Sequence, residues 1–112
     1  MRIESESKSG YTIMRVSGEV DLFNAGELKS TLLDAIHNGA QNLILSMAQV
    51  SYIDSTGIGA LLATLGEVKK RSGQLKLAEL SPGVNKVFQL TRLSGFFEIF
   101  LREADAINSM HA

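Results

Sequence analysis

The residues with the clearest chemical potential lie in the run from Val50 to Gly59, which reads V-S-Y-I-D-S-T-G-I-G. The apolar residues before Asp54 indicate the end of a buried strand, and the pattern that follows predicts a helix beginning at Ser55. The first turn of a helix presents unpaired backbone N–H groups and the positive end of the helix dipole, so the backbone itself would accommodate a phosphate there. Ser55 is therefore a candidate phosphorylation site.

The polar residues around Ser55 also have simpler structural interpretations. Ser55 or Asp54 can act only as a helix cap, a role worth about 1 kcal/mol, and the Asp54 carboxylate can cap the helix and organise the site at once. Thr56 is a second hydroxyl, but its first-turn position favours a helix-start donor over a phosphate acceptor. Asp21, expected at the end of an earlier strand, can simply begin a turn. From the residues alone these alternatives stay open.

Two glycines and an isoleucine complete the motif. Gly57 and Gly59 each cost a helix about 1 kcal/mol relative to alanine, which indicates that the absence of a side chain is useful at both positions. Close approach of a partner is one explanation, and tight packing of the helix start against neighbouring loops is the other. Ile58 is expected to project partly outward, where it could anchor a partner, or else to join the core. We predict Gly57, Ile58 and Gly59 as partner-binding residues.

Composition limits the class of protein. A chain of 112 residues with 45% hydrophobic residues and a net charge of −1 predicts one globular domain spanning residues 1–112. The absence of cysteine excludes disulfides, thiolate metal sites and a cysteine nucleophile, and we expect neither a metal site nor a cofactor. No signal peptide or membrane-spanning run is recognisable, so we expect a cytoplasmic protein without a membrane partner. Interleaved acidic and basic residues argue against a nucleic-acid partner.

The sequence also argues against an enzyme. His37 and His111 are isolated, and no convincing set of histidine, acid and nucleophile surrounds Ser55, so we assign no catalytic residue. A G-x-x-x-x-G-K-[ST] loop is absent as well, which means that phosphate transfer to Ser55 would need ATP bound by another protein. We therefore expect the domain to be a substrate and not an enzyme.

Strands alternate with helices along the chain. Strands are expected at 3–8, 11–19, 43–45, 74–78 and 98–101, and helices after Asn24 up to Gly39, from Ser55 to Ser72, from Pro82, and over 103–110. Asn24 and Glu27 resemble a capping box, and Ser81 resembles a cap before a first-position proline. Leu62, Thr91 and Ala104 are among the residues expected on buried helix faces. The order predicts an α/β domain: a mixed, mostly parallel sheet with an N-terminal antiparallel hairpin and about four helices.

The chain resembles a known family, the STAS domains, and within it the bacterial anti-sigma factor antagonists. The resemblance rests on S-G-E-V-D at 17–21, the run 43–59 with its D-S-T-G-I-G, K-L-A at 76–78 before Ser81-Pro82, and V-F-Q-L-T-R-L at 87–93. In that family the hydroxyl residue directly after the aspartate is phosphorylated by a partner kinase, which here implies Ser55. The resemblance also implies that an acid at Asp21 lies beside the phosphorylation site.

The resemblance implies a partner-switching mechanism. The unphosphorylated protein would bind a serine kinase that is also the anti-sigma factor and so displace the sigma factor. Phosphorylation at Ser55 would release the protein, and a metal-dependent serine phosphatase would restore binding. We expect a monomer when the protein is free. The alternative is a STAS adaptor that docks in a signalling or lipid-transport assembly without phosphorylation.

One position departs from the family pattern. Ser46 stands where many members have an acid, within the run Ser46-Met47-Ala48. If Ser46 lies near Ser55, the loss of a negative charge would make a phosphate easier to hold there.

Overall fold

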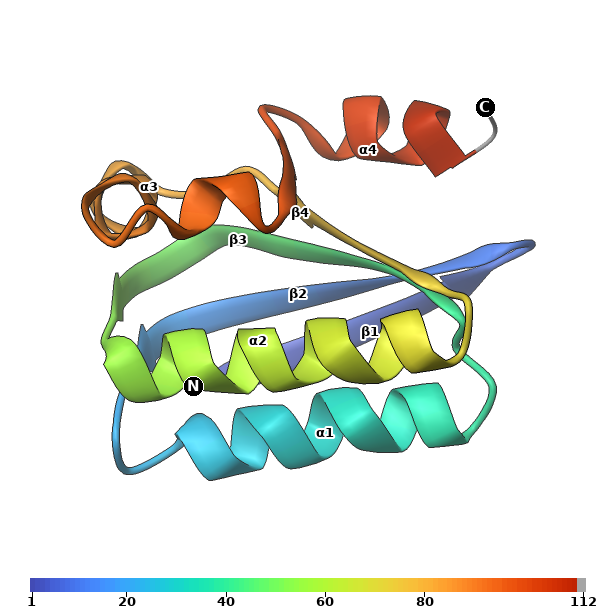
Figure 1. Ribbon diagram of the computed structural model, residues 1–112, viewed down its shortest axis with the longest axis horizontal. Coiled ribbons are helices and arrows are strands. Elements are labelled where there is room, and N and C mark those ends of the chain that lie inside the picture. Colours follow the sequence, from blue (N-terminus) through green and yellow to red (C-terminus); the bar gives the residue numbers. More distant parts are fainter. Residues whose placement is uncertain (111–112) are drawn as a thin grey trace.

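Five strands form a mixed sheet in the order β1-β2-β3-β4-β5 (Figure 1). The structure is a computed structural model, and it describes residues 1–110. β1 and β2 are antiparallel, whereas β2 to β5 run parallel to one another, which confirms the predicted α/β class with an N-terminal hairpin. The strands are β1 Arg2–Lys8, β2 Tyr11–Val20, β3 Asn42–Ile53, β4 Gln74–Ala78 and β5 Glu98–Phe100.

Helices cover both sides of this sheet. α1 and α2 lie side by side on one face, while α3 and α4 lie on the other side (Figure 1). Their bounds within the described residues are α1 Ala25–His37, α2 Ser55–Lys70, α3 Pro82–Leu90 and α4 Glu103–Met110, with a short 3-10 helix η1 at Leu93–Gly95. None of the helices within residues 1–110 is long and apolar enough to cross a membrane. Because β2 and β3 are parallel, the loops that follow them leave the sheet at the same end, where both strands finish.

Local sequence signals explain where the helices begin and end. Gly39 follows α1 with a φ of +107°, a conformation that favours glycine and stops the helix. Ser81 precedes α3, its hydroxyl oxygen accepts the N–H of Val84 at 3.4 Å, and Pro82 occupies the first helical position, as predicted. The predicted capping box at Asn24 is wrong: its side chain makes no capping hydrogen bond to α1.

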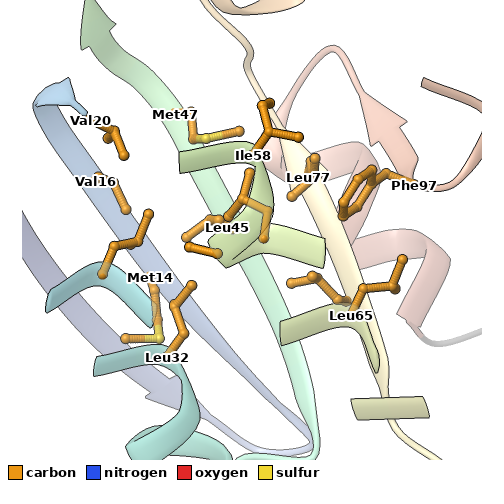
Figure 2. Close-up of a cluster of buried hydrophobic side chains, with 14 of the residues drawn as sticks. Met14, Val16, Val20, Leu32, Leu45, Met47, Ile58, Leu65, Leu77 and Phe97 are labelled. Atoms are coloured by element: carbon orange, nitrogen blue, oxygen red, sulfur yellow. The ribbon is translucent and has the colours of Figure 1, made fainter. Parts of the chain in front are cut away.

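The main core lies between the sheet and the layer formed by α1 and α2 (Figure 2). It contains side chains from β2, β3, β4 and both helices, together with two phenylalanines whose rings, Phe88 and Phe97, pack edge to face with centroids 5.5 Å apart. Fully burying a valine, leucine, isoleucine, methionine or phenylalanine side chain contributes about 1.5–3 kcal/mol, so the cluster holds α2 firmly on the sheet. The labelled members are Met14, Val16, Val20, Leu32, Leu45, Met47, Ile58, Leu65, Leu77 and Phe97.

Three residues predicted to be buried are exposed. Leu62 lies on the outer side of α2, and Thr91 follows α3, where its hydroxyl donates to the Val87 carbonyl at 2.7 Å. Ala104 is exposed, and Ala106 is the buried alanine of α4. Periodicity located these helices correctly, but it misjudged the margins of their buried faces. The 3-10 helix η1 was not predicted, and His111 lies outside the described residues.

The start of α4 is attached to the sheet by a two-pronged ion pair. Arg15 in β2 donates through Nε and Nη2 to the two carboxylate oxygens of Glu103, at 3.0 and 2.9 Å, and through Nη1 to Glu6 at 3.1 Å. The N–H of Glu103 in turn donates to the Glu79 carboxylate at 2.9 Å. The Arg15 guanidinium lowers the pKa of Glu103 and is the main cause of that shift. A paired arginine thus fixes the beginning of the last helix.

A buried lysine makes the second polar attachment of α4. Lys76 in β4 is only 4% exposed, and its ammonium donates to the Ser109 hydroxyl at 2.6 Å and pairs with Glu98 at 3.0 Å. Its ammonium also lies 5.5 Å from the centroid of the Phe100 ring. A buried charge needs such partners to offset its loss of hydration. A second, small apolar cluster lies beneath α4, and the paired side chains of Arg15 and Lys76 lie on the same side of the sheet. Its buried members are Ile13, Ile44, Ala78 and Ala106.

Glu103→Gln is expected to destabilise the fold at neutral pH by about 1–2 kcal/mol, because a charge-assisted pair is lost. The pKa of Glu103 is lowered in the folded protein, so its stabilisation is present above the unfolded-state pKa and disappears as the pH falls through the folded-state pKa. The two unfolding free energies should converge in acid, as measured by urea denaturation over a pH series. Glu4→Gln, whose pair with Arg2 is exposed, is the control and should change little. A pH-independent difference would contradict the expectation.

Candidate functional site

The candidate site forms where β2 and β3 end together. Val20 pairs with Ile53 in the last position of the two parallel strands, so Asp21 and Asp54 follow adjacent strand ends. The N–H of Asp54 donates to the Val20 carbonyl at 3.1 Å, which extends the pairing by one residue. Parallel pairing therefore brings together two acids that are 33 positions apart in sequence, and it supports the predicted place of Asp21 beside the site.

Asp54 joins the start of α2 to the loop between β2 and α1. One carboxylate oxygen accepts the N–H groups of Thr56 and Gly57 at 3.0 and 3.1 Å and also the Thr56 hydroxyl, while the other accepts the N–H of Leu22 at 3.1 Å. The hydrogen bond from the Thr56 hydroxyl is the main cause of the lowered pKa of Asp54, and the backbone N–H donors lower it further. Both interpretations of Asp54 are therefore correct in this structure: it caps the helix, and it organises the neighbouring loop.

Asp21 begins a tight turn. Its carboxylate accepts the N–H of Phe23 at 2.9 Å, and its carbonyl accepts the N–H of Ala25 at 2.8 Å. Asn24 closes the turn from the other side, because its amide oxygen accepts the N–H of Asp21 at 2.9 Å and its amide nitrogen donates to the Glu19 carbonyl at 2.8 Å. The Asn24 side chain is used in this turn, which explains why it does not cap α1.

Ser55 occupies the first helical position of α2 and is exposed. Its hydroxyl makes no hydrogen bond to any residue between 1 and 110, whereas the neighbouring Thr56 hydroxyl is engaged by Asp54. Asp54 caps the start of α2, and the Thr56 hydroxyl bonds to that cap, so the Ser55 hydroxyl has no part in capping the helix. Of the two hydroxyls in the motif, the one on Ser55 is available to an incoming reagent.

The three residues after Thr56 have different environments. A Cβ atom on Gly57 would lie 2.7 Å from the Cγ1 atoms of both Ile53 and Val20, so tight packing explains this glycine. Ile58 is 4% exposed and belongs to the main core, so of its two interpretations the core position is correct and the outward projection is not. Gly59 is exposed, and an added Cβ would meet nothing within 4 Å. Among the three, Gly59 alone offers surface to a partner, and that role stays a prediction.

Ser46 lies far from the candidate phosphorylation site. It is buried in the middle of β3, between Arg15 and Ala78 on the neighbouring strands, and its hydroxyl contributes to the lowered pKa of Glu103. At about 3.3 Å per residue, Ser46 lies roughly 20 Å before the end of β3. A serine there affects the attachment of α4 and leaves the charge around Ser55 unchanged.

Ser55 lies on open surface. Two hollows among the described residues, of about 220 and 420 Å³, are both lined by residues such as Thr12, Gly39 and Ala40, near the opposite end of the parallel strands. No group of three or more histidine, aspartate and glutamate side chains within residues 1–110 is arranged to hold a metal ion. The surroundings of Ser55 therefore suit contact with a macromolecule better than enclosure of a small ligand.

Two features of the site were missed by sequence reasoning. Leu22 and Phe23 form an exposed apolar pair in the β2–α1 loop, directly beside the acids. The sequence signal for this pair was that two large apolar residues stand between Asp21 and Asn24. Aspartate and asparagine are typical of turns, and a turn exposes the residues within it. The second feature is the hydrogen bond from Leu22 to Asp54, which connects residues of two different loops and has no sequence signature.

Comparison with known proteins identifies related sequences. The family model described as STAS domain matches residues 2–106. A curated relative, the anti-sigma-B factor antagonist of Bacillus subtilis, is 36% identical over 86 residues, which cover 77% of this chain and 78% of the relative.

Solved structures share the fold along the whole chain. The anti-sigma factor antagonist SpoIIAA in its unphosphorylated form superposes with a TM-score of 0.83 at 26% identity, covering 98% of this chain and 96% of that chain. The phosphorylated form of SpoIIAA from Bacillus gives a TM-score of 0.74 at 26% identity, covering 96% and 98%. An anti-sigma factor antagonist from Mycobacterium paratuberculosis gives a TM-score of 0.89 at 22% identity, covering 99% and 94%, and shows likeness of fold alone.

Gly57→Ala is expected to lower the free energy of unfolding by about 1–3 kcal/mol, because the added methyl group overpacks against Ile53 and Val20. Gly59→Ala is the matched control in the same helix. It should leave stability unchanged or raise it by up to about 1 kcal/mol, since alanine is the better helix former and the space is open. Urea denaturation of both variants gives the comparison, and equal effects at the two positions would refute the packing explanation.

Proposed function

The chain belongs to the STAS domain family, and from this premise we propose that it is an anti-sigma factor antagonist controlled by phosphorylation. The unphosphorylated protein binds a serine-kinase anti-sigma factor and frees the sigma factor, and a phosphate on Ser55 switches that binding off. The Bacillus subtilis relative is named an anti-sigma-B factor antagonist, and SpoIIAA has both an unphosphorylated and a phosphorylated form. The observation that carries the proposal is the exposed Ser55 hydroxyl, unbonded to residues 1–110, at the first position of α2.

The kinase supplies the nucleotide for the transfer. This chain has no phosphate-binding loop of the G-x-x-x-x-G-K-[ST] type, so it acts as the protein substrate. Ser55 Oγ attacks the γ-phosphorus of ATP, the bond from that phosphorus to the β-phosphate oxygen breaks, and ADP leaves. The hydroxyl proton passes to a base of the kinase or to water. The role of the domain is to present the oxygen, and none of its own groups needs to be catalytic.

The phosphate changes binding through its charge. It adds about −1.5 to −2 charges at neutral pH, next to the carboxylates of Asp54 and Asp21. In the free protein water solvates the phosphate, and the N-terminus of α2 favours an anion. In a complex the same phosphate is desolvated and faces the negatively charged nucleotide of the kinase, so repulsion grows as the local dielectric falls. The domain stays folded while the complex loses stability.

A metal-dependent serine phosphatase reverses the switch by removing the phosphate from Ser55. The exposure of Ser55 suits this step, because a second enzyme must reach the same oxygen. In this proposal the protein works in the cytoplasm and is monomeric when free. A constitutive adaptor could dock through the same surface, but it would not need a hydroxyl that performs no structural task. The unused hydroxyl of Ser55 therefore favours the switch over the adaptor.

Incubation with ATP and the anti-sigma kinase recovered with this protein from its own cells is expected to add one phosphate, at Ser55. Ser55→Ala should bind that kinase with the wild-type affinity and accept no phosphate. Thr56→Ser is the control, since it keeps the Asp54-bonded hydroxyl and should still be phosphorylated at Ser55. Site-resolved mass spectrometry checks the assignment, and a phosphate located on residue 56 would overturn it.

Ser55→Asp is expected to weaken kinase binding while keeping the free energy of unfolding within about 1 kcal/mol of the wild type, as for an exposed position. An acid in the first turn is also compatible with the helix dipole. Calorimetric titration of the kinase and a urea denaturation curve give the two quantities. Equal affinity of Ser55→Asp and wild type would contradict switching by charge.

A further inference from the structure

The loop between β2 and α1 exposes two large apolar side chains next to the phosphorylation site. Phe23 is 94% exposed and Leu22 is 69% exposed. Scattered exposed leucines are normal, but a phenylalanine with almost all of its surface in water gains no folding energy from its ring. The fold of residues 1–110 therefore gains little hydrophobic stabilisation from this pair.

The backbone that carries Leu22 and Phe23 is fixed. The N–H of Leu22 donates to Asp54 at 3.1 Å, and the N–H of Phe23 donates to Asp21 at 2.9 Å. Asn24 braces the turn through two further hydrogen bonds. A side chain presented on an ordered backbone loses less conformational entropy when it is buried by a partner. The loop is thus built to hold an apolar pair outward.

The Leu22–Phe23 pair lies within reach of any protein that covers Ser55. Asp54, the residue before Ser55, bonds directly to the Leu22 amide, so loop and acceptor are neighbours at one end of the molecule (Figure 1). A stable protein interface buries about 800 Å² on each partner, which corresponds to a patch with a radius of roughly 16 Å. An interface of this size that includes Ser55 has room to cover the neighbouring loop as well.

We propose that Leu22 and Phe23 are the apolar anchor by which the serine-kinase anti-sigma factor docks, inserted into an apolar pocket beside the kinase's phosphotransfer centre. The inference rests on the proposed function, and it adds the surface and the kind of pocket that recognise the unphosphorylated protein. The anchor supplies affinity by burial, while the hydroxyl of Ser55, two residues after the end of β3, supplies control. Docking energy and switching thus come from different residues joined by Asp54.

Phe23→Ala tests the anchor. With the anti-sigma kinase that binds the wild-type protein, this variant should bind about 30-fold more weakly or worse, as for aromatic residues at the centre of an interface. Phosphorylation of Ser55 should show a raised KM with little change in kcat, because the acceptor itself is intact. The unfolding midpoint should stay at the wild-type value, since the ring is exposed.

Phe96→Ala is the matched control. Phe96 is 63% exposed and lines a hollow with Lys69, which lies about 20 Å along α2 from Ser55 at 1.5 Å per residue. The same truncation at this distance should leave kinase affinity and KM unchanged. Equal weakening by both variants would show a general effect of removing surface phenylalanine and would overturn the anchor.

The outcomes distinguish a failure of the anchor proposal from a failure of the proposed function. If the kinase binds and phosphorylates wild type and Phe23→Ala equally well, the anchor is wrong while the proposed function stands. If no kinase recovered with the protein binds wild type or phosphorylates Ser55, the proposed function itself fails. Sedimentation of the free protein tests whether a second copy of this chain covers Leu22 and Phe23 instead of the kinase. A wild-type dimer that Phe23→Ala dissociates would assign the pair to that contact and overturn the proposal.

Discussion

The carboxylate of Asp54 connects every part of the candidate site. Its two oxygens accept hydrogen bonds from the first turn of α2 and from the loop that follows β2, so one side chain sets the position of Ser55 relative to that loop. The interaction depends in turn on parallel pairing of β2 and β3, which ends both strands at the same level. The lowered pKa of Asp54 keeps the carboxylate charged and able to accept at all of these positions.

Much of this architecture could be predicted because its signals are local. Periodicity and turn residues located the strands and helices, and Ser81 with Pro82 marked the start of α3 to the residue. The helix start at Ser55 followed from the change of pattern after Asp54, and the resemblance to STAS domains supplied its role. Capping and site organisation were both open for Asp54, and its hydrogen bonds show the cap of α2 and a link to the loop after β2.

The remaining features depend on contacts between segments distant in sequence. Position 57 needs a glycine because Val20, on β2, occupies the space where a side chain would lie. No pattern in the sequence near Gly57 indicates that contact. Ile58 was left open between an outward, partner-facing position and the core, and its packing in the main cluster decides for the core. Asn24 resembles a cap in sequence, but the turn at Asp21 uses its side chain first. Competition between equally satisfactory local partners is decided only by the tertiary fold.

Unequal constraint across the motif has an evolutionary consequence. Asp54 and Thr56 are bonded, and Gly57 and Ile58 are packed, so most substitutions at these four positions carry a cost in stability. Ser55 lies among them without a structural task inside residues 1–110, and its replacement leaves the fold intact. With Ser55 as the proposed phosphorylation site, a lineage would gain or lose regulation by a single change at this position. Duplicated copies of such a domain would be expected to diverge here into regulated and permanently active forms while their folds stay alike.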